Sequence, residues 1–268
     1  VLSNPKDSTL QYQKIIDEYC SSDSERGWYL QLLAKFKYNT SKSDSNTFQV
    51  SAYKKNFELL KPKIGINYNK LIYLNENRIR RIKDWLTSHS TSEDLILDIS
   101  SILDNLSFDI DSQKFEKALY DIGMALGFLS QRPEKEFKTG PDNLWCGVND
   151  QYFLFECKNK VEDSRKEIYK FETGQMNNSC GWFKENYRNA SVKSVLIIKT
   201  NVLAHDANFN DDVEIMRKNK LNDLKQHIKA FFKEFNKMNL SDISDDKINQ
   251  LLILHKIDIE SLKSLYTE

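Results

Sequence analysis

Residues 152–158, Tyr-Phe-Leu-Phe-Glu-Cys-Lys, constrain the fold most, because a carboxylate stands inside an otherwise apolar run. The run is rich in aromatic residues and follows the turn signal at residues 147–150, which predicts a buried β-strand. Side chains of a strand alternate between its faces, so Glu156 and Lys158 face one way and Cys157 faces the other. Burying an ionised glutamate is costly unless it is paired or binds a metal ion, so this strand predicts either a structural ion pair or a functional site.

A second carboxylate, Asp142, follows Gly140 and Pro141 at the start of the preceding element. On neighbouring strands, Asp142 and Glu156 would form an oxygen-rich site of the kind that Mg²⁺ prefers. Lys158 would then orient a water that attacks a phosphodiester, while the metal offsets the charge of the transition state. The simpler alternatives are that Asp142 opens a type I turn and that Glu156 only pairs with Lys158.

Pro141-Asp142 followed by Glu156-Cys157-Lys158 resembles the motif of the PD-(D/E)xK nuclease superfamily, the restriction-endonuclease-like fold. The resemblance implies an α/β fold, with a mixed β-sheet core flanked by helices and with helical N-terminal and C-terminal additions. The family order of helix, three-stranded meander, helix and strand can be followed from about residue 111 to residue 200. The predicted elements are a helix at 111–130, a first strand at 134–137, second and third strands carrying Asp142 and Glu156, a helix at 167–187 and a strand at 192–200.

The resemblance also implies roles for individual residues. Mg²⁺, for which Mn²⁺ can substitute, would be bound by Asp142, Glu156, the Cys157 carbonyl and Glu116, which lies in the first helix. Lys158 would position the nucleophilic water, and Gln175 in the second helix would assist. Part of the family has a tyrosine four positions after this glutamine, whereas this chain has Ser179. The implied activity is a Mg²⁺-dependent nuclease in restriction or anti-phage defence, with DNA favoured over RNA.

Basic residues follow the third strand and give candidates for phosphate contacts: Lys160, Arg165, Lys166 and Lys170. In a second basic run, residues 78–83, a helix would place Ile79 and Ile82 in the core and Arg78, Arg81 and Lys83 at the surface. These cations could contact phosphates, but such a run is more often a solvated helix face. The chain has 39 basic and 39 acidic residues, so nucleic-acid binding would have to be local. This balance favours delivery of the substrate by a larger protein or a partner subunit.

The pattern predicts three regions: a helical subdomain at 1–108, the nuclease-like core at 109–237 and a helical extension at 238–268. Expected N-terminal helices cover 10–19, 27–38, 48–60, 69–86 and 93–106, with a polar loop at 39–46 and Ser92 as an N-cap. An amphipathic helix is predicted at 210–236, and two short helices after residue 240, the first capped by Ser244 or Asp245.

Several functional classes are disfavoured by the sequence. The four cysteines form no CxxC pair, which disfavours a structural zinc site and disulfides. There is no run of eighteen apolar residues and no signal-peptide pattern, so we expect a cytoplasmic protein without a membrane partner. The first residues, which lack a methionine, suggest a piece of a longer protein. Two other functions remain open: a catalytically silent nuclease-like module that docks nucleic acid or protein, and a purely helical adaptor whose strands are structural.

Overall fold

The computed structural model describes residues 14, 16, 18–63, 68–72, 78–148, 150–162, 164–236 and 238–268. It divides into two compact units. The helical unit comprises residues 1–69 and 133–139, and the sheet unit comprises residues 70–132 and 140–268. The boundaries expected at residues 108 and 237 both lie inside the sheet unit. The helix predicted at 10–19 lies mostly outside the described residues.

The helical unit contains α2 (Asp23–Lys37), α3 (Lys42–Lys55) and the short α7 (Pro133–Phe137). The backbone N–H of Asp44 donates to the Ser41 hydroxyl, so α3 begins inside the predicted polar loop, and it ends before the predicted residue 60. The strand predicted at 134–137 is wrong, because these residues form α7. Proline is favoured at the first position of a helix, where its fixed φ fits and its missing N–H is not needed.

The sheet unit is built on a five-stranded mixed sheet, which confirms the predicted α/β class. The strands lie in the order β1-β2-β3-β4-β5, with the first two pairings antiparallel and the last two parallel. Their bounds are β1 (Leu129–Gln131), β2 (Asn143–Cys146), β3 (Gln151–Cys157), β4 (Ser191–Ile197) and β5 (Val213–Met216).

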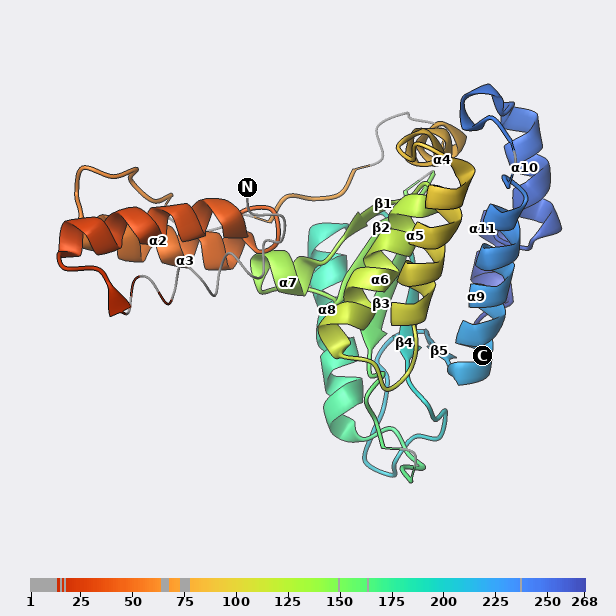
Figure 1. Cartoon of the computed structure of the whole chain (residues 1–268). Helices are drawn as coiled ribbons and strands as arrows, with labels where there is room; N and C mark the ends of the chain where they lie inside the picture. The colour runs from red at the N-terminus through yellow and green to blue at the C-terminus, as the bar shows by residue number, and fades with distance from the viewer. Residues whose placement is uncertain are drawn as a thin grey trace. The chain divides into compact units, whose positions relative to one another are not determined.

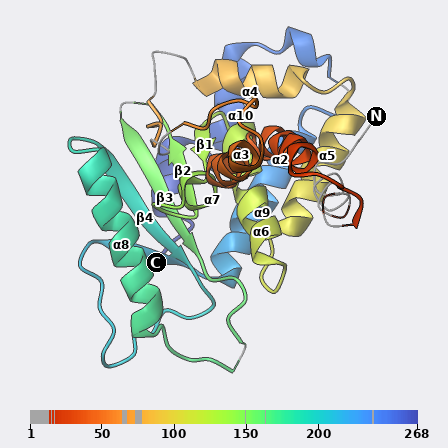
Figure 2. The same ribbon diagram turned by 90° about the vertical axis from the view of Figure 1, so that its left-hand side faces the viewer.

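Helices cover both faces of this sheet. Figures 1 and 2 show α8 on one face and α5, α6 and α9 on the other. A single hydrophobic core joins α4, α5 and α6 to the sheet, to α9 and to the C-terminal helices. The helices are α4 (Arg78–Thr87), α5 (Ser92–Asn105), α6 (Ser112–Ala125), α8 (Lys170–Asn186), α9 (Lys218–Lys233), the 3₁₀ helix η1 (Leu240–Asp242), α10 (Asp245–Leu254) and α11 (Ile259–Ser264). Among the described residues, no helix is both long and apolar enough to cross a membrane.

Two predicted helices extend too far. The helix expected to reach residue 130 ends at Ala125, because Gly127 adopts a φ of +78° and Leu129 begins β1. Glycine reaches this left-handed region without steric cost and commonly terminates helices. The helix expected at 210–236 begins only at Lys218, because Val213 pairs with Ser194 and starts β5.

The basic run at 78–83 contributes to the core more than the sequence indicated. Ile79 and Ile82 are buried, as predicted, but Arg78 is buried as well. Arg78 Nε donates to the carbonyl oxygen of Leu126 at 2.8 Å, and its Nη2 donates to that of Ile257 at 2.9 Å. Arg78 therefore connects α4 to the end of α6 and to the C-terminal region, and its predicted exposure is wrong.

The helix predicted at 69–86 corresponds to α4, which covers only Arg78–Thr87. Residues 68–72 are not helical, and residues 73–77 of the predicted helix at 69–86 lie outside the described residues. Thr91, and not Ser92, accepts the N-cap hydrogen bond of α5. Ser244 caps α10, as predicted.

Candidate active site

Strand β3 positions the two central residues of the site. Glu156 is only 5% exposed and faces α8, where the Ser179 hydroxyl donates to Glu156 Oε1 at 2.6 Å. Lys158, the first residue after the strand, places its Nζ 3.3 Å from Glu156 Oε2. Cys157 faces the opposite side and belongs to the hydrophobic core. The predicted alternation of Glu156, Cys157 and Lys158 is therefore confirmed.

Asp142 lies beside this pair, immediately before β2. Its Oδ2 accepts a hydrogen bond from the backbone N–H of Cys157 at 2.8 Å, which ties it to the end of β3. Burial, and then the negative charge of Asp142, raise the pKa of Glu156 to about 7. Burial lowers the pKa of Lys158, but the charges of Glu156 and Asp142 raise it more, so its pKa is raised overall. The three predicted residues thus form one electrostatic group.

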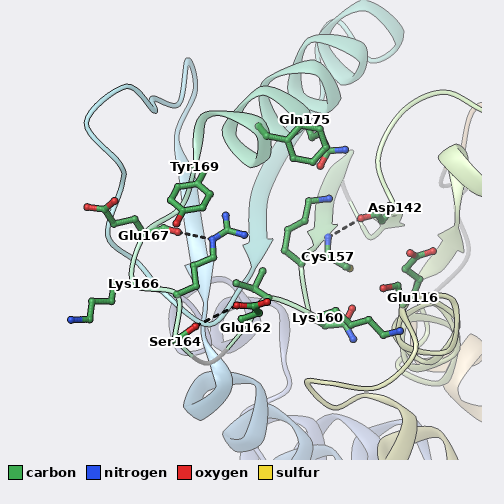
Figure 3. Close-up of a pocket in the computed structure, with 16 residues that line it drawn as sticks. Glu116, Asp142, Cys157, Lys160, Glu162, Ser164, Lys166, Glu167, Tyr169 and Gln175 are labelled. Carbon is green, nitrogen blue, oxygen red and sulfur yellow. Dashed lines mark hydrogen bonds between the residues drawn. The ribbon is translucent and has the colours of Figure 1, made fainter.

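An open cleft of about 990 Å³ is lined by Asp142 and Lys158 of this group. Its lining comes from α6, from Asp142, from the end of β3, from the loop at 158–167 and from the start of α8. Figure 3 shows Glu116 and Asp142 on one side of the cleft and Tyr169 on the other, with Gln175 reaching in from α8. Cys157 and Lys158 also line it, so the predicted catalytic and metal-binding residues other than the buried Glu156 all line this cleft.

Glu116 lines the same cleft, as a residue of α6. Its Oε2 accepts a hydrogen bond from the Nη2 of Arg132, and both side chains are largely buried. The sequence did not indicate this partner, because Arg132 follows β1, a strand that was predicted several residues later. The role of Glu116 as a metal ligand stays a prediction, and a metal ion would share this carboxylate with Arg132.

Helix α8 contributes two polar groups at a spacing of one helical turn. Gln175 lines the cleft, and among the described residues its buried Oε1 has no hydrogen-bond partner. Ser179, four positions later, holds Glu156. The serine that departs from the family pattern therefore supports the central carboxylate, a role that its i+4 spacing from Gln175 could have indicated.

Only three of the four residues predicted to contact phosphates line the cleft. Lys160, Arg165 and Lys166 line the cleft, whereas Lys170 is exposed and is not part of its lining. Lys160 Nζ lies 3.8 Å from the carboxylate of Asp111 in an exposed ion pair. Arg165 is held inside the cleft wall, where its guanidinium pairs with Glu172 and lies over the ring of Tyr169.

The donor set fits a hard divalent cation with few protein ligands. Among the described residues, no three His, Cys, Asp or Glu side chains come together in a way that could hold a metal ion. Asp142 and Glu156 nevertheless lie close enough for the charge of one to raise the pKa of the other, and a bound cation would relieve that repulsion. Two carboxylates and a backbone carbonyl suit Mg²⁺, which usually keeps several of its waters.

Comparison with protein-family models, with curated proteins and with solved structures finds no match to this chain. The inference of function therefore rests on the motif and on the cleft itself.

Proposed function

We propose that this chain is a divalent-metal-dependent nuclease of the PD-(D/E)xK type that hydrolyses phosphodiester bonds, with DNA favoured over RNA. The observation that carries the proposal is the buried Glu156, which lies beside Asp142 and Lys158, two residues that line the cleft. As a setting we propose restriction or anti-phage defence in the cytoplasm, with the chain serving as a module of a larger protein.

Each group of the proposed site would have its own role. Asp142, Glu156 and the Cys157 carbonyl would hold Mg²⁺ or Mn²⁺, which when bound supplies positive charge against the charge that develops on the phosphate. Lys158 carries an ammonium, held by Glu156, that can orient the attacking water or a phosphate oxygen. Gln175 can hydrogen-bond a water or a phosphate oxygen through its amide.

A purely structural ion pair between Glu156 and Lys158 does not explain why Asp142 lies beside them. Glu156 and Lys158 would form such a pair without Asp142, whose negative charge makes ionisation of Glu156 more costly. Adjacent carboxylates with one raised pKa are typical of sites that bind cations or move protons. The position of Asp142 therefore favours a functional site.

Cleavage assays test the proposal. Linear, circular and single-stranded substrates would be incubated with wild type in Mg²⁺, Mn²⁺, Ca²⁺ or EDTA, and then with Asp142→Asn, Glu156→Gln and Lys158→Met. We expect metal-dependent cleavage by wild type and its loss in all three variants. Glu167→Gln is the matched control, because it removes an exposed carboxylate that lines the same cleft. Wild-type turnover in any of the three variants would refute the assignment.

A catalytically silent nuclease-like module that docks nucleic acid or protein is the second candidate. The pairing of Glu116 with Arg132 favours it, because this carboxylate already has a cationic partner. Binding of nucleic acid that weakens steeply with salt, without cleavage in any metal, would support a nucleic-acid-binding module.

A further inference from the structure

Two exposed aromatic side chains line the cleft at the start of α8. Tyr169 is 48% exposed and Phe171 is 70% exposed, although large aromatic residues of a folded chain are mostly buried. Neither was among the predicted site residues. Figure 3 shows the Tyr169 ring on the side of the cleft opposite Asp142 and Glu116. The ring thus lies across the cavity from the carboxylates of the proposed active site.

The orientation of Tyr169 is fixed by its neighbours. Its backbone N–H donates to Glu172 Oε2 at 2.9 Å at the beginning of α8. The guanidinium of Arg165 lies 4.0 Å from the centre of the Tyr169 ring, and it is held there by an ion pair with Glu172 and by a 3.1 Å hydrogen bond to the carbonyl of Glu167. A ring held in this way is oriented before a ligand arrives, which reduces the entropy lost on binding.

The charges of the cleft do not by themselves favour a polyanion. Its described lining contains four carboxylates and four cationic side chains: Glu116, Asp142, Glu162 and Glu167, and Lys158, Lys160, Arg165 and Lys166. A groove that binds duplex DNA through phosphates alone is usually strongly basic. In this balanced cleft, affinity would have to come largely from the faces of the aromatic rings.

Stacking on aromatic side chains requires bases whose faces are accessible. In a duplex these faces are covered by neighbouring bases, whereas unpaired nucleotides offer them to Tyr, Phe and Arg side chains. We propose that Tyr169 and Phe171 form a base-stacking subsite for unpaired nucleotides, supplied by single-stranded DNA or RNA. The proposal deepens the proposed function, on which its link to cleavage rests, by naming the class of substrate.

Binding in EDTA tests the subsite separately from catalysis. The probes are labelled single-stranded DNA, the matching RNA, a blunt duplex of the same sequence, and an abasic single strand that keeps the phosphates but lacks bases. Affinity would be measured by fluorescence anisotropy for wild type, Tyr169→Ala, Tyr169→Phe and Phe171→Ala. Phe57→Ala is the control, because Phe57 is 73% exposed and does not line the cleft.

We expect wild type to bind single strands more tightly than the duplex or the abasic strand. Tyr169→Ala and Phe171→Ala should each lower this affinity by roughly tenfold to a hundredfold, while Tyr169→Phe and Phe57→Ala stay near wild type. The DNA and RNA arms identify which single strand is preferred. Equal affinity for single strands and duplex, or no loss in either alanine variant, overturns the subsite even if cleavage is observed. Ring-dependent binding without cleavage in any metal would support the subsite and overturn the nuclease.

Discussion

Raising the pH should destabilise the metal-free protein through Glu156. Burial and the charge of Asp142 raise the pKa of Glu156 to about 7, against 4.5 for an ordinary glutamate. Between these values the folded protein binds this proton more tightly than the unfolded chain. The contribution to the free energy of unfolding is therefore fully present below pH 4.5 and is lost as the pH rises through 7. At about 1.4 kcal/mol per pKa unit, the loss amounts to about 3 kcal/mol.

Other groups titrate in the same range, so the measurement needs a variant that removes only this ionisation. Glu156→Gln cannot ionise and keeps an acceptor for the Ser179 hydroxyl. Urea unfolding in EDTA would be followed from about pH 4.5 to about pH 8 for wild type, Glu156→Gln and the control Glu167→Gln. We expect the stability of wild type relative to Glu156→Gln to fall by about 3 kcal/mol across this range, while Glu167→Gln follows wild type. A difference that is constant with pH would show that Glu156 ionises like a surface glutamate.

Four further predictions concern neighbouring parts of the site and the fold. Glu116→Gln should lower the cleavage rate by roughly ten- to a hundredfold, with partial rescue at high Mg²⁺ or in Mn²⁺, and an unchanged rate at limiting metal would exclude a role for this carboxylate. Gln175→Ala should lower the rate by a similar factor without changing the urea midpoint, and a shifted midpoint would indicate a structural role. Arg78→Lys should reduce the free energy of unfolding by about 2 kcal/mol, since one ammonium cannot reach both carbonyl oxygens that Arg78 binds, and equal urea midpoints would contradict this. A fragment of residues 109–237 should not fold cooperatively, because it lacks α4, α5, α10 and α11 of the shared core, and a sharp thermal transition of that fragment would disprove it.

The positions of Glu156, Lys158 and Asp142 could be predicted because they depend on the local sequence. Alternation along one strand places Glu156 and Lys158 on the same face, whatever the rest of the chain does. The prediction for Asp142 required only that the next strand lie alongside, and β2, which ends at Cys146, pairs antiparallel with β3, which begins at Gln151. The helix that carries Gln175 was also predicted, although it begins at Lys170 and not at residue 167, and ends at Asn186 and not at residue 187.

The parts that were predicted wrongly depend on long-range pairing. Strand β1 has only three residues, and Ser130 is recognisable as a strand residue only through its pairing with Trp145. Strand β5 lies in a run whose apolar spacing also fits a helix, and its parallel pairing with β4 decides between the two. Such contacts join residues that are distant in sequence, so the local pattern contains no signal for them.

The buried contacts of three arginines were not predicted, for a different reason. Sequence reasoning assigns arginine to the surface by default, whereas Arg78, Arg132 and Arg165 all make largely buried contacts in this chain. A guanidinium has five donors in a plane and can satisfy several carbonyl and carboxylate oxygens together, so it is the cation best suited to such positions. Whether a given arginine is used in this way depends on which acceptors the fold brings near it.

The net charge of the cleft makes its affinity for a phosphodiester depend on whether a metal ion is bound. With Glu156 ionised beneath it, the described lining of four carboxylates and four cations becomes negative by one charge. A phosphodiester that enters this cavity would then meet net repulsion, offset only by stacking on Tyr169 and Phe171. A divalent cation between Asp142 and Glu156 adds two positive charges and changes the sign of the balance. The same ion that the carboxylates require would therefore also make the cleft attractive to a phosphate, so metal and nucleic acid should each increase the affinity for the other.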